Sequence, residues 1–327
     1  MPHVFVDGLR APATVLELSH WPGNRTPRAL KGDVSTQAVL RLLGCHAAER
    51  DRLLGAATAV TCDHYDVDGL LSVFCLVRPT AATKHRHLLD RVARCGDFDV
   101  FTGAAAVQAC LALLSAEREV ANRLKPTSVE GATEALFREM LECAEECLLA
   151  PGAWAAAWEA EWEHIARSAA YLAETPDALT TRGDLAILHD APEALHDYAV
   201  HARTAAGHVL RVRPDGCHSL RFRYESFVDM QTRAPRPRVH GDVLADCLNA
   251  AERNGTWFCE SPATATPLLQ LYTDSGVPSA SSFDPAEIER QVSEFFGEAK
   301  ANPSLQWRPH SGWLNEAPGT PPSKATA

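Results

Sequence analysis

A short apolar segment that runs into a cluster of acidic residues is the feature that most restricts this fold. Ala56–Cys62 (AATAVTC) predicts a buried strand, and Asp63–Gly69 (DHYDVDG) follows it as a polar turn that ends in glycine. Leu70–Val77 is apolar and predicts a helix that leaves this turn, and Pro79 stops that helix soon afterwards. The order strand, turn, helix is typical of a parallel sheet in an α/β protein.

The rest of the first half predicts two more strands and a block of helices. His3–Asp7 and Thr14–Leu18 are expected strands, and a helix is expected to begin at Asp33 or Ser35 and to run through Leu43. After these elements, apolar residues recur at three- and four-residue spacing, which is the pattern of amphipathic helices. The expected helices of this block are Ala104–Leu124, Gly131–Leu149 and Trp154–Ala173.

The second half predicts a mixture of strands and helices. The expected strands are Asp184–Leu188, Gly207–Val212 and His218–Tyr224, and the expected helices are Gly241–Glu252 and Pro285–Lys300. We therefore predict an α/β fold in which a parallel sheet with helical elaboration precedes a smaller α+β region. The expected boundaries are residues 1–178 for the first domain, 179–316 for the second, and 317–327 for a flexible tail.

Composition limits where and on what such a chain acts. The 327 residues carry a formal net charge of -11, and a negative surface repels the phosphates of nucleic acids, so extended nucleic-acid binding is not expected. Ten cysteines are scattered without a CxxC pair, which is typical of reduced thiols in a core. No apolar run near the motif approaches the length of a membrane span, and the first residues do not resemble a signal peptide. We expect a cytoplasmic protein without a membrane partner.

The acidic turn carries the chemistry that the sequence predicts. His64, Asp66 and Asp68 alternate along the chain and offer two carboxylates and one imidazole. That donor set suits Mn²⁺, Mg²⁺ or Fe²⁺. Carboxylates that lie close together repel one another unless a cation neutralises them. The alternative is an acidic loop in which Asp66 or Asp68 caps the next helix.

Other residues are candidates for the same site. Asp97 and Asp99 in the segment CGDFD are possible later ligands, and Asp7 is a possible added ligand because it ends the first strand. We expect Asp97 or Asp99 to lie beside Asp66 or Asp68. The loop SHWPGNRTP (residues 19–27) follows a predicted strand and is expected at the same edge of the sheet.

Basic residues are the candidates for substrate binding. His20, Arg25 and Arg28 lie in or next to that loop, and two arginines can clamp phosphate or carboxylate oxygens. An ordinary turn is the alternative. Arg223 is a further candidate for an anion clamp, and a solvated, ion-paired strand face is the alternative there.

The segment VTCDHYDVDGLLS resembles the first motif of the DHH phosphoesterase superfamily, over about Ala56–Val77. The resemblance implies that His64, Asp66 and Asp68 hold two Mn²⁺ or Mg²⁺ ions, which activate a bridging water to attack phosphorus. Asp97 is the nearest analogue of the second motif of that superfamily. The Asp-His-His triplet and the C-terminal glycine-rich motif are absent from this sequence. The whole chain is also similar to a group of bacterial proteins of uncharacterised function that share this motif and the SHWPGN loop.

The predicted function is metal-dependent hydrolysis of a phosphate ester or anhydride, with a small anionic substrate. One alternative is a redox enzyme of specialised metabolism with one metal ion or a di-iron site. Two Glu-x-x-His motifs, Glu161–His164 and Glu193–His196, suggest the di-iron version. Its additional ligands would be Glu134, Glu142 and Glu146. The other alternative is a non-catalytic binding module derived from the DHH fold.

Overall fold

The N-terminal part is built on a small parallel sheet. The computed structural model describes residues 1–124, 128–191, 193–234 and 236–309. The sheet has the order β2-β1-β3, where β1 is His3–Val6, β2 is Thr14–Leu18 and β3 is Ala59–Thr61. β1 pairs in parallel with both neighbours, so the carboxyl ends of all three strands lie at one edge. The predicted parallel sheet and its shared edge are confirmed.

The third strand corrects the sequence prediction. We expected a buried strand over Ala56–Cys62, whereas β3 has three residues, all of them half-buried. β3 is an edge strand that pairs only with β1, so one of its sides has no neighbouring strand to cover it. The apolar character of this segment therefore overstated both the length and the burial of the strand.

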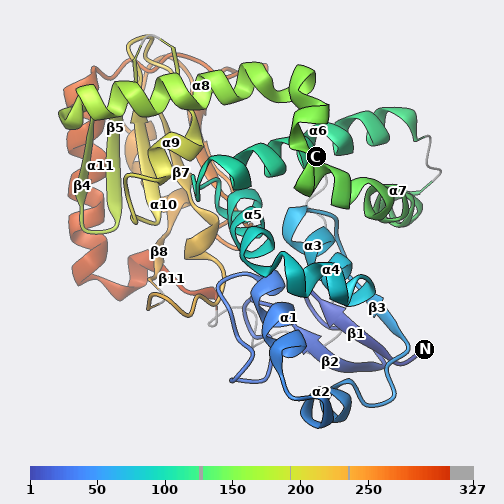
Figure 1. Cartoon of the computed structure of the whole chain (residues 1–327). Helices are drawn as coiled ribbons and strands as arrows, with labels where there is room; N and C mark the ends of the chain where they lie inside the picture. The colour runs from blue at the N-terminus through green and yellow to red at the C-terminus, as the bar shows by residue number, and fades with distance from the viewer. Residues whose placement is uncertain (125–127, 192, 235, 310–327) are drawn as a thin grey trace.

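Helices pack on this sheet and extend it. They are α1 Ser35–Gly44, α2 Ala47–Leu54, α3 Val67–Val77, α4 Pro79–Lys84, α5 Arg86–Phe98, α6 Ala104–Arg123, α7 Val129–Leu149 and α8 Ala155–Glu174. α3 is the most apolar of the N-terminal helices and is buried on nearly every side, with Leu70 and Leu71 fully enclosed. Figure 1 shows α3 above the sheet and next to α5, so the residues of both helices reach the carboxyl edge of the strands.

The C-terminal part contains a larger, mixed sheet of order β4-β5-β6-β7-β10-β9. Its strands are β4 Leu179–Arg182, β5 Leu185–His189, β6 His208–Val212, β7 Ser219–Phe222, β9 Thr256–Cys259 and β10 Leu268–Tyr272. Within this sheet, β5 and β6 pair in parallel and the other neighbouring strands pair antiparallel. A short ribbon joins β8 Arg238–Val239 to β11 Gln306–Trp307.

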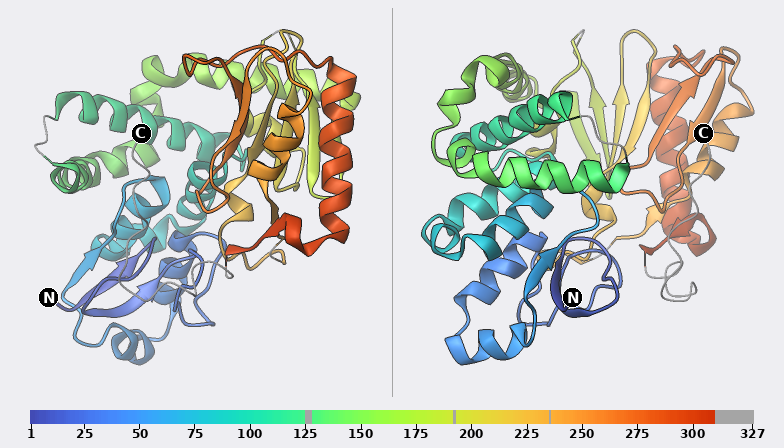
Figure 2. Two further views of the ribbon diagram at one scale, coloured as in Figure 1. Left: turned by 180° about the vertical axis from the view of Figure 1, so that it is seen from behind. Right: turned by 90° about the vertical axis from the view of Figure 1, so that its right-hand side faces the viewer.

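Both faces of this sheet are covered. α10 Gly241–Asn249 and α11 Pro285–Ala301 pack on one face, and α8 packs with α9 Asp197–His201 on the other (Figure 2). Leu185 and Ile187 of β5 pack in the core between the sheet and the helices α10 and α11, whereas Ala186 and Leu188 pack in the core between the sheet and the helices α8 and α9. Successive side chains of a strand point to opposite faces, so a strand between two layers is apolar throughout.

One segment of the second half returns to the first. The 3₁₀ turn Tyr224–Ser226 follows β7, and Tyr224, Phe227 and Met230 pack into the same core as the N-terminal helices. The predicted boundary after residue 178 coincides with the start of β4, but the two halves share this core segment. The predicted tail, residues 317–327, lies outside the described residues.

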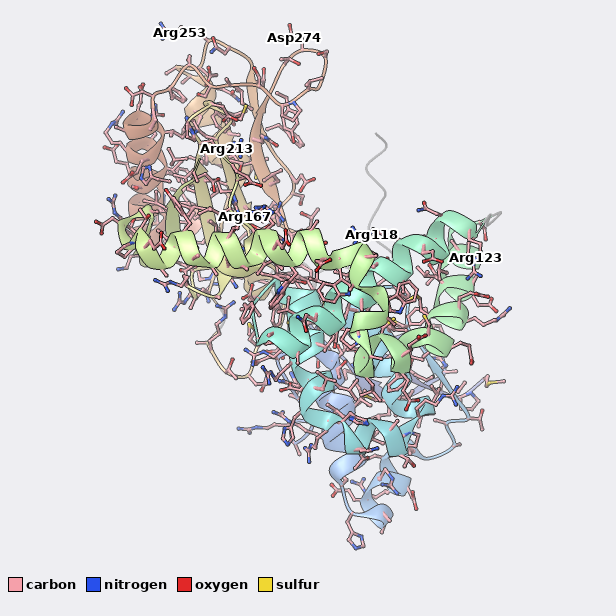
Figure 3. The ribbon with its side chains drawn as sticks, turned by 45° about the horizontal axis from the view of Figure 1, so that its top comes forward. Arg118, Arg123, Arg167, Arg213, Arg253 and Asp274 are labelled. Carbon is pink, nitrogen blue, oxygen red and sulfur yellow. The ribbon has the colours of Figure 1, made fainter. Side chains whose placement is uncertain are left out.

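Charged side chains cover the outer surface of the helical block. Arg118, Arg123 and Arg167, labelled in Figure 3, project from α6 and α8 with 58–66 % of their side-chain surface exposed. Each forms an ion pair with a glutamate, and such exposed pairs contribute little to stability. None of the helices within the described ranges is long and apolar enough to cross a membrane.

Candidate metal centre

Asp7 lies at the end of β1 and is completely buried. Its backbone adopts a left-handed conformation (φ +47°), which is uncommon for a residue other than glycine. Gly8 follows with φ +97°, and a Cβ atom there would lie only 2.2 Å from Oδ1 of Asp63. The chain therefore turns sharply after β1, with Asp63 packed closely against that turn. A strained carboxylate position of this kind is typical of functional sites.

Two histidines face the two oxygens of Asp7. Nε2 of His20 lies 3.5 Å from Asp7 Oδ1, and Nε2 of His64 lies 3.2 Å from Asp7 Oδ2. Asp7 Oδ2 and His20 Nε2 are buried and have no hydrogen-bond partner. Native proteins rarely leave buried polar atoms without a partner, and a missing ion or water is a usual explanation. His20 follows β2 and His64 follows β3, so the three segments converge at one sheet edge.

Each histidine forms a hydrogen bond through Nδ1 to an oxygen atom outside the centre. Nδ1 of His20 lies 2.6 Å from the backbone oxygen of Asp33, and Nδ1 of His64 lies 2.7 Å from Oδ1 of Asp63. A carbonyl oxygen only accepts hydrogen bonds, so Nδ1 of His20 carries a proton. Metal-binding histidines commonly have this arrangement, which directs Nε2 toward the ion.

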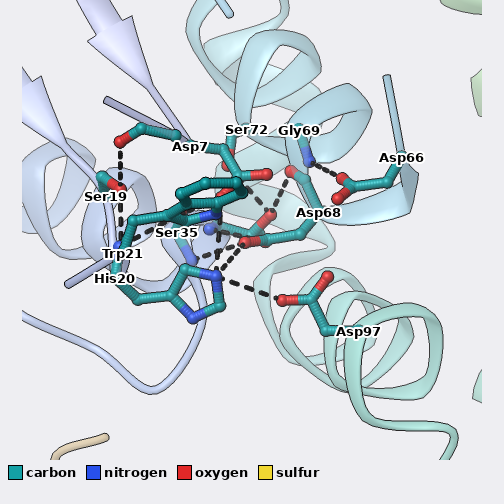
Figure 4. Close-up of polar contacts among 12 residues, drawn as sticks. Asp7, Ser19, His20, Trp21, Ser35, Asp66, Asp68, Gly69, Ser72 and Asp97 are labelled. Atoms are coloured by element: carbon teal, nitrogen blue, oxygen red, sulfur yellow. Dashed lines mark hydrogen bonds and ion pairs between the residues drawn. The ribbon is translucent and has the colours of Figure 1, made fainter. Parts of the chain in front are cut away.

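Asp68 and Asp97 complete the deeper part of the centre (Figure 4). Asp68 lies in the first turn of α3, and its carboxylate accepts the backbone N–H groups of Ser35 and Thr36 at 2.6 and 2.8 Å. It thereby caps the N-terminus of α1, for which no residue of α1 itself provides a side-chain cap. Oδ2 of Asp68 and Oδ2 of Asp97 lie 3.9 and 3.4 Å from Nε2 of His20. Asp97 Oδ2 is buried and accepts no hydrogen bond.

Asp66 both caps a helix and faces the centre. Oδ1 accepts the backbone N–H of Gly69 at 2.7 Å as the N-cap of α3, while Oδ2 lies 3.0 Å from His64 Nε2. The two interpretations of this residue, a helix cap and a metal ligand, are therefore compatible. Cys62 lies close by and donates from Sγ to the backbone oxygen of Asp7 at 3.4 Å.

Among the residues that the structure describes, two groups of side chains have the spacing of a metal site, and Asp7 belongs to both. Asp7, His20 and Asp68 form one group, and Asp7, Cys62 and His64 form the other. Within each group, the possible ligand atoms all lie within 4.8 Å of one another. Each group could therefore hold a cation, and the Asp7 carboxylate belongs to both groups.

The crowded acids shift one another's pKa values. Burial and the nearby Asp7 charge raise the pKa of Asp68 to about 7, and burial with the Asp68 and Asp66 charges raises the pKa of Asp97 well above its usual range. Burial also opposes ionisation of Asp7, but the nearby imidazoles of His20 and His64 and their charges outweigh it and lower the Asp7 pKa. Burial lowers the pKa of His20 and of His64, but the nearby Asp7, Asp68, Asp63 and Asp66 oppose this and raise both pKa values. The two histidines, Asp68 and Asp97 therefore hold protons more strongly than free side chains do.

Aromatic rings surround the two histidines. The Tyr224 ring lies 5.6 Å from the His20 ring, and the Trp21 ring lies 5.2 Å from the His64 ring, measured between centroids. Burial, together with the Asp7 and Asp97 charges, raises the pKa of Tyr224, so its hydroxyl group stays protonated. These rings reduce the access of water to the centre, and electrostatic interactions are stronger where water is excluded.

Of the residues predicted to bind substrate, His20 lies in the centre itself, whereas none of the three arginines is paired with an acid of the centre within the described residues. Arg25 and Arg28 are exposed, and the backbone N–H of Arg25 bonds to the Glu17 carboxylate. Arg223 does not form the expected anion clamp on the surface. Its side chain is 2 % exposed, and its guanidinium donates to the carbonyls of Thr204 and Ala206. Its charge is also paired with Glu225, so the group is committed to internal structure.

The other residue of the CGDFD segment faces elsewhere. Asp99 ends α5 in the left-handed conformation, with φ +48°. Burial and the Asp197 charge raise its pKa to about 7, while the Arg221 charge acts in the opposite direction. Asp97 is therefore the acid of this segment that joins the centre, and Asp99 faces the second half of the chain.

The two Glu-x-x-His motifs meet, but they do not build the predicted di-iron site. Oε1 of Glu161 lies 3.5 Å from Nε2 of His196, and Oε1 of Glu193 lies 3.9 Å from Nε2 of His164. Only the first motif is on a long helix, since residues 193–196 form a loop before α9. Among the residues that the structure describes, these four do not form a group with metal-site spacing.

The sequence patterns assign less to three residues than the structure shows. Asp7 was only an added ligand, although Asp7-Gly8 repeats the Asp68-Gly69 pair and also follows a short apolar segment. Asp33 was interpreted only as a possible helix cap, and Asp63 was given no role. No local signal marks Asp33, because it acts through its backbone oxygen.

Comparison with known proteins assigns the chain to a family. No curated protein and no solved structure matches it. One family model, described as a family of unknown function (DUF6687), matches residues 1–307. This span contains the sheet, the helices and all the side chains of the candidate metal centre. The chain therefore belongs to the DUF6687 family.

Proposed function

We propose that the chain is a metal-dependent hydrolase of a phosphate ester or anhydride, with two divalent ions at the centre around Asp7. The observation that carries the proposal is the position of this carboxylate between two histidine Nε2 atoms, at 3.5 and 3.2 Å. Both histidines are oriented by an oxygen outside the centre, as metal-binding histidines are. Protonated histidines without a metal could neutralise the charge of Asp7, but His20 Nε2 and Asp97 Oδ2 would still be buried without hydrogen-bond partners.

The ligand sets start from the two histidines and add the carboxylates that lie closest to each Nε2 atom. One ion would be held by His20, Asp68 and Asp97, and the other by His64 and Asp66. Asp7 would bridge them. Carboxylate and imidazole donors favour Mn²⁺, Mg²⁺ or Fe²⁺, and ions about 3.5–4 Å apart are typical of two-metal hydrolases.

The protein's own residues prepare this chemistry. The bound ions would lower the pKa of a bridging water and neutralise charge on the phosphate oxygens. The left-handed Asp7 backbone and the α1 N-terminus, bonded to Asp68, fix two carboxylates before any ion arrives. Preorganisation of this kind reduces the reorganisation that binding and catalysis require. The aromatic rings of Trp21 and Tyr224 reduce the access of bulk water.

The test is phosphate release by purified, metal-stripped protein after addition of Mn²⁺, Mg²⁺ or Fe²⁺. Small phosphate esters and inorganic pyrophosphate are the probes. We expect hydrolysis that depends on the metal and is lost in Asp7→Asn, with Asp99→Asn as a matched control that retains activity. Hydrolysis that is equal in Asp7→Asn and the unaltered protein would contradict the proposal.

A mononuclear iron or di-iron redox enzyme is the second candidate, because Cys62 and the histidines add softer donors to the acids. Oxygen uptake by the Fe²⁺-loaded protein, without release of phosphate from any probe, would favour it. A folded protein that retains no metal after dialysis against Mn²⁺ or Fe²⁺ would instead favour a binding module.

A further inference from the structure

The two sides of the centre differ in donor chemistry. The side of His20 presents oxygen and nitrogen atoms, from Asp7, Asp68 and Asp97 as well as the imidazole. The side of His64 includes a sulfur, because Cys62 Sγ lies within 4.8 Å of the possible ligand atoms of Asp7 and His64. Thiolate is a soft ligand, which Zn²⁺, Fe²⁺ and Co²⁺ accept readily and Mg²⁺ does not.

Gly69 lies close to these donors, and a side chain there would crowd them. A Cβ atom at this position would lie 3.1 Å from Cys62 Sγ, 3.3 Å from Asp66 Oδ1 and 3.4 Å from Asp7 Oδ2. Gly69 lies in α3 and is not among the glycines with positive φ, so its backbone conformation does not require glycine. What favours glycine here is the close approach of a sulfur and two carboxylate oxygens to one point.

Cys62 also differs from the cysteines that only fill the core. Cys75, Cys95 and Cys110 are completely buried, as small apolar side chains are. Cys62 is half-buried and free of any disulfide, and it borders the buried Asp7 Oδ2 that has no hydrogen-bond partner. Its position is therefore that of a donor beside an unsatisfied carboxylate.

We propose that the position beside His64 is a mixed sulfur, nitrogen and oxygen site that selects a thiophilic divalent ion, with Cys62, His64 and Asp7 as ligands. This inference rests on the proposed metal centre and refines it. The position beside His20, which lacks sulfur, takes the harder ion. As the bond between Sγ and the metal forms, the thiol proton leaves to solvent and no electron is transferred. The centre thus holds two different metals, for which Fe²⁺ or Zn²⁺ with Mn²⁺ is the expected pairing.

Cobalt titration of the metal-stripped full chain tests the inference. Co²⁺ bound by a thiolate shows a sulfur-to-metal charge-transfer absorption in the near ultraviolet, in addition to the visible bands of any bound Co²⁺. We expect the unaltered protein to show both, and Cys62→Ser to keep visible bands from the His20 side while it loses the charge-transfer absorption. Cys247→Ser removes an exposed thiol on α10 and is the control that should keep both signals.

Gly69→Ala provides a second variant that leaves the sulfur in place. Its methyl group would crowd the three donors, so we expect one cobalt ion per chain rather than two and no charge-transfer absorption. If the unaltered protein binds cobalt without that absorption, the inference about Cys62 is overturned and the metal centre stands. If the protein binds no cobalt at all, both are overturned. The charge-transfer absorption of the unaltered protein tests the inference directly, so the result does not depend on whether a variant folds.

Discussion

Asp33 connects His20 to the second half of the chain. Its backbone oxygen lies 2.6 Å from Nδ1 of His20, while its carboxylate accepts the backbone N–H groups of Gln231 and Thr232 at 2.7 and 2.9 Å. The backbone N–H of Asp229 in turn donates to the oxygen of His20 at 2.7 Å. The segment after Tyr224 therefore holds the loop that carries one histidine of the centre, and the two halves of the chain cooperate in building it.

The first prediction concerns this link. Asp33→Ala removes the buried carboxylate that accepts the N–H groups of Gln231 and Thr232. It should destabilise the fold by about 1–3 kcal/mol, because bonds to a charged acceptor are lost while water can partly replace them at these two exposed residues. Asp33→Asn retains an oxygen that can accept both bonds and should cost less. In protein that still folds, the backbone oxygen bonded to His20 remains but loses the contacts that position it, so metal affinity should fall by less than the roughly 10–100-fold that complete loss of an outer partner costs. Denaturant unfolding and metal titration measure the two effects, and unchanged affinity in a destabilised Asp33→Ala would oppose the link.

The second prediction separates ligand loss from structural damage. The pKa of Asp97 is raised well above its usual range by burial and by the Asp68 and Asp66 charges, which favours the protonated form of this carboxyl group. Asp97→Asn resembles that protonated form and should leave the stability of the metal-free protein nearly unchanged. The stabilisation gained on adding Mn²⁺ should fall by about 1.4 kcal/mol for each tenfold loss of affinity. Thermal unfolding with and without Mn²⁺ measures both.

Asp99→Asn is the matched control for this experiment. Asn tolerates the left-handed conformation that Asp99 adopts, and Asp99 faces Asp197 and Arg221 rather than the centre. The control variant should keep the full increase in unfolding free energy that Mn²⁺ gives the unaltered protein. An equal loss of metal stabilisation in both variants would remove Asp97 from the ligand set.

The third prediction concerns pH. The folded-state pKa of Asp68 is raised to about 7, so its protonated form contributes stability that is complete below the unfolded pKa of about 3.8 and is lost as the pH rises through about 7. A metal must displace protons from the centre, so its binding strengthens over the same interval. The gap in unfolding free energy between metal-bound and metal-free protein should therefore widen from about pH 5 to about pH 7. A gap that stays constant over this range would count against a metal bound by these acids.

The fourth prediction lies outside the centre. Glu252 accepts hydrogen bonds from Trp257 Nε1 at 3.0 Å, from Ser281 Oγ at 2.6 Å and from the backbone N–H of Ser282 at 2.9 Å. Burial raises its pKa, but the hydrogen bonds from Ser281 and Ser282 dominate and lower the pKa to about 2. Glu252→Gln should cost about 1–2 kcal/mol at neutral pH, because bonds to a charged acceptor are lost but water partly screens the group.

The sign of the pH effect at Glu252 is opposite to that at Asp68. A lowered folded-state pKa gives stability that is present above the unfolded value of about 4.5 and is lost as the pH falls through about 2. The difference between Glu252→Gln and the unaltered protein should therefore shrink in acid. Denaturant unfolding at neutral and acidic pH checks this, and a difference that grows in acid would refute the assigned role.

Local sequence patterns determined most of the elements and part of the centre. The helices from α6 to α8 and the strands β5, β6 and β7 appear close to their predicted positions, because the spacing of apolar residues reports burial directly. The turn His64–Asp68 was recognisable because it combines three possible ligands with a glycine and a following apolar helix. The parallel sheet also followed from local order, and it placed His20 at the same edge.

Only the tertiary structure decided which residues complete the centre. Asp7, His20, Asp68 and Asp97 are separated along the chain, and their oxygen and nitrogen atoms meet because β1, β2, α3 and α5 pack at one edge of the sheet. Asp33 acts through a backbone oxygen that any residue possesses, so no side-chain pattern marks it. Arg223 has the side chain of an anion clamp, but packing against Thr204 and Ala206 commits it to the interior. Sequence spacing records which residues are buried along one element, whereas the distance between two elements depends on the packing of all the others.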